Sequence, residues 1–165
     1  MENLTEQVKG RLIHYFGKDV RRINHALKVH SLAAHIGSLE RLPEAELLLL
    51  ETAALLHDIG IKEAERRFHS AAARYQEELG PGVARELLAD LELPADFLAR
   101  LEFLIGNHHS YARIDGPDFQ ILVEADFLVN IFEGEMDNQQ VLSIGEKYFR
   151  TAAGRALLAT LFGNE

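Results

Sequence analysis

The stretch LLLLETAALLHDIG, from Leu47 to Gly60, decides the fold expected for this chain. It is apolar on almost every side, with Glu51 and Thr52 in its middle, which is typical of a buried helix. The stretch ends in His57 and Asp58, so it delivers an imidazole and a carboxylate into the interior. Asp58 lies near the expected helix C-terminus, where the helix dipole disfavours an anion. We therefore expect a cation beside Asp58: an arginine, a lysine or a metal ion.

The composition favours one globular domain. Of the 165 residues, 47% are hydrophobic and 26% charged, which is ordinary for a domain with a sizeable core. The net charge of −9 argues against binding polymeric nucleic acid, which needs a basic surface. The lack of cysteine excludes disulfides, thiolate metal sites and cysteine nucleophiles. Because no stretch approaches a membrane span and residues 1–10 lack a signal-peptide core, we expect no membrane association and a cytoplasmic protein.

The pattern along the chain predicts an all-α fold, since Ala, Leu, Glu and Arg dominate and β-branched residues are sparse. The expected helices are 4–16, 19–39, 43–58, 70–79, 82–91, 94–107, 119–132 and one or two within 141–162. We expect Gly60 to end the third helix and Gly80–Pro81 to separate the fourth from the fifth. Residues 63–67 are expected to form a charged segment. The apolar tail, 141–162, either closes the core or forms the face of a homo-oligomer.

Three histidines lie on or beside apolar helix faces. His25 precedes Val29 by four residues and therefore lies beside the core-facing stripe of its helix. Taken alone, it is best interpreted as a core histidine bonded to a backbone carbonyl. His108 continues the apolar series that includes Leu101, and His109 follows it. For these two residues a polar helix end and a functional role are equally good interpretations.

Asp126 is a second carboxylate that we expect in the apolar interior, where, like Asp58, it needs a cation. It lies in ILVEADFLVNIF, and Leu122 and Val129 make its helix face apolar. Two buried carboxylates repel each other unless a cation lies between them. Asn130, one turn further on, is a candidate hydrogen-bond partner for Asp126.

These residues form a set of nitrogen and oxygen ligands without sulfur. The set comprises His25, His57, Asp58, Asp126 and either His108 or His109. Such a set suits a divalent Mn, Fe, Co, Ni, Zn or Mg ion, and not Cu(I) or an iron–sulfur cluster. The alternative is structural, with each aspartate satisfied by an arginine or by backbone N–H groups.

The order of these residues resembles the HD-domain superfamily of metal-dependent phosphohydrolases. The matching segments are HALKV (25–29), AALLHDIG (53–60), IGNHH (105–109) and EADFL (124–128), within a motif core of about residues 21–130. The resemblance implies a single helical-bundle domain over residues 1–165. It implies one divalent metal ion held by His25, His57, Asp58 and Asp126. It also implies hydrolysis of a phosphate ester, often of a nucleotide, by a metal-bound water.

On this resemblance, further residues become candidates for the reaction. Asp58 is expected to contact the attacking water, Glu77 to position that water, and His108 to steady the phosphate. The candidates for substrate binding are Arg22, Lys28, Lys62 and His109. The candidates for a second metal are His69, Glu77, His108 and His109. We favour one metal with an incomplete second site.

The chain departs from the family pattern at two positions. Ile61 stands where many relatives carry the lysine of HD-x-x-K, with Lys62 one residue later, and Glu77 stands where relatives often carry a histidine. The main hypothesis is an enzyme acting on a small phosphorylated, nucleotide-like substrate. The first alternative is a catalytically weak HD module that binds a nucleotide as a sensor or partner protein. The second is a hydrolase of a non-phosphate substrate or an oxygenase-like di-iron protein.

Overall fold

The computed structural model describes residues 3–163, and this part of the chain is helical with no strand. The prediction of an all-α fold is confirmed. In chain order the helices are α1 (Leu4–Phe16), α2 (Val20–Leu39), α3 (Glu44–Leu56), α4 (Ile61–Phe68), α5 (Ala73–Leu87), α6 (Ala95–Asn107), α7 (Pro117–Glu133), α8 (Asn138–Tyr148) and α9 (Ala152–Phe162), with 3-10 turns η1 (Ala89–Leu91) and η2 (Tyr111–Arg113). Residues 1–2 and 164–165 of the predicted domain lie outside the described residues, and its boundaries stay a prediction.

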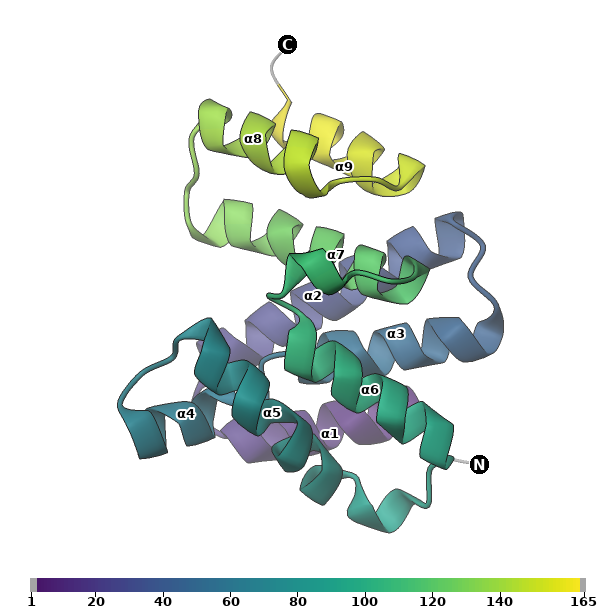
Figure 1. Ribbon diagram of the computed structural model, residues 1–165, viewed down its shortest axis with the longest axis vertical. Helices are drawn as coiled ribbons and strands as arrows, with labels where there is room; N and C mark the ends of the chain where they lie inside the picture. Colours follow the sequence, from purple (N-terminus) through teal and green to yellow (C-terminus); the bar gives the residue numbers. More distant parts are fainter. Residues whose placement is uncertain (1–2, 164–165) are drawn as a thin grey trace.

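Helix α3, which carries the apolar stretch, lies at the centre of the bundle (Figure 1). It packs against α1, α2, α6 and α7, while α2 also packs against α7. Every residue from Thr52 to His57 is buried, as the all-round apolar pattern predicts. His57 and Asp58 follow directly at the C-terminal end of this helix. The packing therefore places them between helices from distant parts of the chain.

Two glycines expected near helix ends, Gly60 and Gly80, allow two segments to come close together. Helix α3 ends at Leu56, before Gly60, and α5 runs unbroken through Gly80 and Pro81. A Cβ on Gly60 would lie 2.7 Å from the amide nitrogen of Gly80, so only glycine permits this approach. The predicted break between 70–79 and 82–91 was therefore wrong. The charged segment 63–67 also lies within a helix, α4.

The C-terminal pair α8 and α9 covers α7, at the top of Figure 1. The Glu124 carboxylate, fully buried on α7, accepts hydrogen bonds from the backbone N–H groups of Arg150 (2.8 Å) and Thr151 (3.0 Å). It also accepts one from the Thr151 hydroxyl at 2.5 Å. Because the N-terminus of a helix favours an anion, Glu124 fixes α9 onto the core without needing a metal. The tail thus closes the core, and a homo-oligomer stays a prediction.

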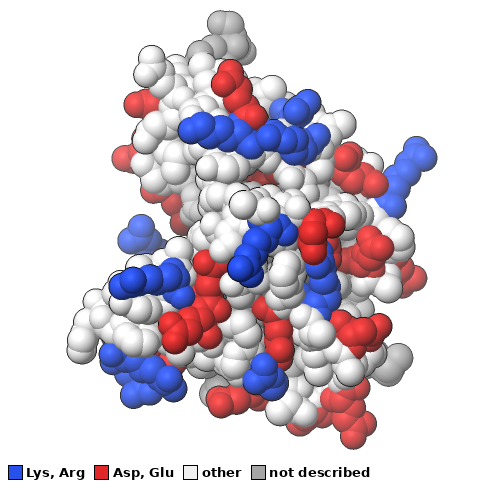
Figure 2. All heavy atoms as spheres, in the orientation of Figure 1, with Lys and Arg blue, Asp and Glu red and all other residues white. Residues whose placement is uncertain are grey.

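The surface shows no continuous basic area on the face drawn in Figure 2, where groups of Lys and Arg alternate with Asp and Glu. The absence of a polymeric nucleic-acid partner stays a prediction. Among the described helices, none is both long enough and apolar enough to cross a membrane. The cytoplasmic location stays a prediction.

Because Gly154 lies against the Glu124 carboxylate, an alanine at residue 154 should destabilise the fold. A Cβ on Gly154 would overlap the Glu124 carboxylate, so Gly154→Ala should lower the free energy of unfolding by about 1–3 kcal/mol. The matched control is Gly82→Ala, because a Cβ there meets nothing within 4 Å and helical alanine is favoured by about 0.5–1 kcal/mol. Urea unfolding followed by circular dichroism measures both. Equal effects of the two substitutions would contradict the proposed role of Glu124.

Candidate metal centre

Four predicted ligands meet where α2, the end of α3 and α7 come together. The Nε2 atoms of His25 and His57 lie 3.2 Å apart. Asp126 Oδ1 is 3.1 Å from Nε2 of His25 and 3.3 Å from that of His57. Asp58 Oδ2 is 3.4 Å and 3.3 Å from the same two nitrogens. Side chains that are up to 101 residues apart in the sequence thus share one small volume.

The histidine rings are held with Nε2 directed at the carboxylates. His57 donates Nδ1–H to the Ala54 carbonyl at 2.7 Å, and His108 donates Nδ1–H to the Ile105 carbonyl at 2.8 Å. Both carbonyls belong to the last turn of a helix, where carbonyl groups lack helical partners. In a neutral imidazole with Nδ1–H, Nε2 carries a lone pair. These lone pairs therefore face carboxylate oxygens, an arrangement that needs a proton or a metal ion between them.

The charges of the cluster shift its pKa values strongly. Burial lowers the pKa of His57, but Asp58 and Asp126 outweigh burial and hold this pKa well above 6.5. Burial raises the pKa of Asp58, but His57 and His108 outweigh it and hold this pKa well below its ordinary value. The pKa of Asp126 is lowered against burial by the same kind of contact, with His57 and His25. The carboxylates are therefore ionised and require positive charge beside them.

The donor set fits a divalent metal ion. Potential ligand atoms of His25, His57 and Asp58 all lie within 4.8 Å of one another. One ion at roughly 2.0–2.4 Å from each donor can bridge such a group. With Asp126, the set has two imidazole nitrogens and two carboxylates, which suits the divalent ions expected from the sequence. The two aspartates would neutralise the ion's charge.

A second group of potential ligands adjoins the first through Asp58. Its members are Asp58, His108 and His109, whose candidate atoms also lie within 4.8 Å of one another. Asp58 Oδ1 is 3.2 Å from His108 Nε2. Burial and the neighbouring His108 lower the pKa of His109, which favours the neutral ring that a metal needs. The structure thus brings together two of the four candidates for a second metal.

The other two second-metal candidates lie elsewhere. Glu77 Oε2 accepts from the His109 backbone N–H at 3.3 Å and from the Ser110 hydroxyl at 3.0 Å. Glu77 therefore braces the turn that carries His109. His69 is exposed at the C-terminal end of α4, with a left-handed φ of 53°, and belongs to neither group of potential ligands.

An open, wholly polar pocket of about 480 Å³ borders the first group. The residues that line it are Asp19, Arg21, Arg22, His25, Asp58, Asn130 and Glu133. Two of the four predicted ligands, His25 and Asp58, thus lie in the pocket wall, so a substrate in the pocket would meet the candidate metal. Asn130 lines the pocket and makes no side-chain hydrogen bond to Asp126 among the described residues, unlike the contact expected from their spacing.

Of the predicted substrate-binding cations, only Arg22 lines this pocket. Its guanidinium is already paired with Glu65 on α4 and lies 3.3 Å from Asp19. Arg22 therefore links α2 to α4 as well as facing the pocket.

The two predicted lysines are directed elsewhere. Lys62 donates to the Tyr15 carbonyl at 2.8 Å and lies over the Tyr15 ring, so it ties α4 to α1. Lys28 lies 3.9 Å from Glu133 and over the Phe132 ring. Neither lysine lines the pocket. The structure therefore holds Lys62 away from the pocket and places Lys28 beside Glu133 at its edge.

Three residues that line the pocket, Asp19, Arg21 and Glu133, were not predicted from the sequence. Glu133 accepts from His25 Nδ1–H, at 3.1 Å and 3.2 Å for its two oxygens. Its spacing of seven residues from Asp126 places both on one helix face, and this signal could have found it. Arg21 lines the pocket, and no ion pair or hydrogen bond involves its side chain within the described structure. Arg21 was not predicted as a site residue because adjacent charged residues usually lie on a solvent-exposed face.

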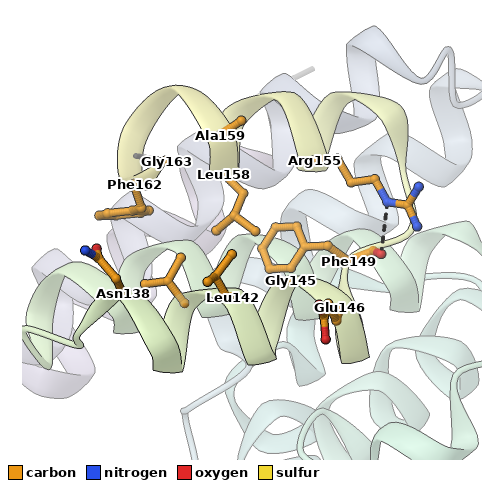
Figure 3. Close-up of a pocket in the computed structure, with 11 residues that line it drawn as sticks. Asn138, Leu142, Gly145, Glu146, Phe149, Arg155, Leu158, Ala159, Phe162 and Gly163 are labelled. Atoms are coloured by element: carbon orange, nitrogen blue, oxygen red, sulfur yellow. Dashed lines mark hydrogen bonds between the residues drawn. The ribbon is translucent and has the colours of Figure 1, made fainter. Parts of the chain in front are cut away.

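An apolar pocket of similar size, about 470 Å³, lies between α8 and α9 (Figure 3). Leu142, Phe149 and Leu158 point into it, and Arg155 closes one end by donating Nε–H to the Phe149 carbonyl at 3.2 Å. Its lining residues include neither histidine nor aspartate. It therefore offers no ligand set for metal chemistry.

Comparison with known proteins agrees with this geometry. A family model described as HD domain matches residues 22–142. The chain belongs to the HD-domain family. It is therefore a member of a superfamily of metal-dependent hydrolases, and the family expected from the sequence is confirmed. The match begins just before His25 and extends beyond Asp126, so it includes all four predicted ligands. A comparison with curated proteins gives no match.

The fold is similar to a crystal structure of a predicted HD superfamily hydrolase from an uncultured Thermotogales bacterium. The two share 24% sequence identity, with a TM-score of 0.70. The similarity covers 96% of this chain and 90% of the other. It therefore extends to the C-terminal helices beyond the segment that the family model matches.

The raised pKa of His57 predicts how pH affects the metal-free protein. Stability from protonated His57 is fully present below the unfolded pKa, about 6.5, and is lost as pH rises through the higher folded pKa. The free energy of unfolding with EDTA should therefore fall above about pH 6.5. Mn²⁺ should slow this fall, because the ion replaces the proton between the ligands. Urea unfolding across this range measures both. A free energy of unfolding that stays constant or rises above pH 6.5 without metal would contradict the charge arrangement.

Proposed function

We propose that this chain hydrolyses a phosphate ester of a small, nucleotide-like molecule in the polar pocket beside His25 and Asp58. The proposal depends on one observation: imidazole Nε2 atoms and ionised carboxylates converge at the wall of an open pocket. The ion would be Mn, Fe, Co, Ni, Zn or Mg, held by His25, His57, Asp58 and Asp126. When bound, it supplies an activated water and a Lewis acid for the phosphoryl oxygen.

Asp58 and His108 are the residues that orient the attacking water in this proposal. Asp58 Oδ2 faces the first ligand group, while its Oδ1 faces His108 Nε2 at 3.2 Å. With His108 Nδ1–H donated to a carbonyl, both facing atoms are acceptors. A hydrogen from a water or from a protonated His108, or else a second metal ion, must then satisfy these two atoms. This is the position from which a water can be held against a substrate in the pocket.

Glu77 and His109 act at the edge of this arrangement. Glu77 holds the backbone of His109 through Oε2. In the proposal it keeps the His108–His109 turn in place and so positions the water indirectly. His109, neutral and half-buried, contacts the substrate or a second ion.

Arg21 is the cation that we add for phosphate binding. The pocket carries the carboxylates of Asp19, Asp58 and Glu133, which repel an anionic substrate. Arg22 is paired with other residues, whereas the Arg21 guanidinium makes no contact with an acidic group in residues 3–163. It can therefore donate two parallel N–H bonds to a phosphate.

A catalytically weak nucleotide-binding module remains the second candidate. The observation that favours it is Lys62, which donates to the Tyr15 carbonyl and so leaves the pocket without a lysine. Binding of a nucleotide with no turnover under any of the metals would decide for this candidate.

Removing a central ligand tests the proposed enzyme. Asp58→Ala should abolish stoichiometric metal binding and lower phosphatase activity by at least about 100-fold, since one ligand of each group disappears. Metal analysis and assays over a nucleotide panel with Mn²⁺, Mg²⁺, Co²⁺ and Ni²⁺ measure the change. Asp96→Asn, on the exposed start of α6, is the control and should behave as wild type. Full metal content and full activity in Asp58→Ala would contradict the site.

Arg21 should matter for substrate binding more than the lysines do. Arg21→Ala should raise KM by about 10-fold or more, because a charge-assisted bond to phosphate contributes about 1.5–3 kcal/mol. Lys62→Ala removes the same charge outside the pocket and should leave KM within about 2-fold, since exposed, screened charges contribute little. Steady-state kinetics of both variants, with metal content checked, make the comparison. If Lys62→Ala raised KM more than Arg21→Ala did, Lys62 and not Arg21 would be assigned to phosphate binding.

A further inference from the structure

We infer that Glu133 is a positioning residue for the metal centre and acts through His25. The inference deepens the proposed function and depends on it, because His25 must be a ligand for the role to exist. Both oxygens of Glu133 lie within hydrogen-bonding distance of His25 Nδ1, at 3.1 Å and 3.2 Å. The hydrogen on Nδ1 is thereby fixed, and the Nε2 lone pair is directed at Asp126 and His57.

His25 needs a partner from another helix because of its place in its own helix. His57 and His108 lie at helix C-terminal ends, where each reaches a free carbonyl three residues back. His25 is the sixth residue of the 20-residue helix α2, where the backbone carbonyls are engaged in helical hydrogen bonds. A side chain from α7 therefore supplies the acceptor. Of these three histidines, only His25 is held by a group that mutation can remove.

The position of Glu133 is otherwise unfavourable. It is the last residue of α7, before the cap Gly134, and a helix C-terminus disfavours a carboxylate. The carboxylate is also largely covered, with 24% of the side chain exposed. Positive groups compensate for this: His25 Nδ1–H in direct contact and Lys28 Nζ at 3.9 Å. A divalent ion on the other side of the imidazole would strengthen the first of these contacts.

The consequence for metal binding follows from the geometry. A carboxylate that accepts from a ligating histidine fixes the ring and raises the basicity of its other nitrogen. Without Glu133, the His25 ring is free to turn or to carry its hydrogen on Nε2, and either change removes a donor from the ion. Glu133 should therefore control metal affinity.

The test compares Glu133→Ala with Glu133→Gln by Mn²⁺ titration calorimetry of the metal-free protein. Both variants remove one negative charge, but the glutamine oxygen still accepts from Nδ1–H. We expect Glu133→Ala to weaken Mn²⁺ binding by about 10–100-fold and Glu133→Gln by only a few-fold. The matched control is Glu86→Gln. Glu86 is exposed on α5 and does not line the pocket, so this variant should bind Mn²⁺ as wild type does.

The outcomes separate the possible failures. If Glu133→Ala binds Mn²⁺ as tightly as wild type, the positioning role is wrong and the proposed function stands. If Glu133→Gln loses as much affinity as Glu133→Ala, the effect is one of charge alone and the positioning role is again wrong. If the wild-type protein binds no Mn²⁺, Co²⁺, Ni²⁺ or Zn²⁺, the proposed function itself fails. Urea unfolding of each metal-free variant shows whether a loss of affinity reflects a loss of folding.

Discussion

The structure depends on placing two ionised carboxylates, Asp58 and Asp126, beside imidazole lone pairs in its interior. Each buried charge without a partner costs on the order of several kcal/mol, so the cluster is stable only with protons or a metal ion in its centre. Three helices provide the residues of this cluster: α2 contributes His25, His57 follows the end of α3, and α7 carries Asp126. The same contacts that hold these helices together therefore define the site.

Helix ends supply much of the local organisation. The free carbonyls at the ends of α3 and α6 orient His57 and His108, and the free N–H groups at the start of α9 satisfy the buried Glu124. The contrast between Glu124 and Asp58 is informative. Both are carboxylates among apolar residues, but Glu124 meets a helix N-terminus, which favours an anion, whereas Asp58 follows a C-terminus, which does not. Of these two carboxylates, Asp58 is therefore the one that needs a cation.

The sequence was sufficient for most of the helices and for choosing candidate ligands that lie close together, and insufficient for contacts between distant segments. Periodicity placed α1, α2, α6 and α7 to within a few residues, because their apolar faces are continuous. Polar residues on those faces identified the cluster for the same reason. Gly80 was misinterpreted as a helix break, since local propensity cannot reveal that one glycine is needed for the close approach of another. The contacts of Lys28 and Lys62 could not be predicted either, because tertiary contacts determine where long exposed side chains lie.

The close contact between Gly60 and Gly80 also bears on the departure at Ile61. With α5 packed against the turn that follows Asp58, residue 61 points into the core and is 9% exposed. A lysine there would have to bury its charge, whereas isoleucine joins the hydrophobic cluster. The neighbouring Lys62 faces α1 instead. A cation for an anionic substrate must then come from another element, and the first turn of α2, with Arg21 in the wall of the pocket, is the part of the described chain that provides one.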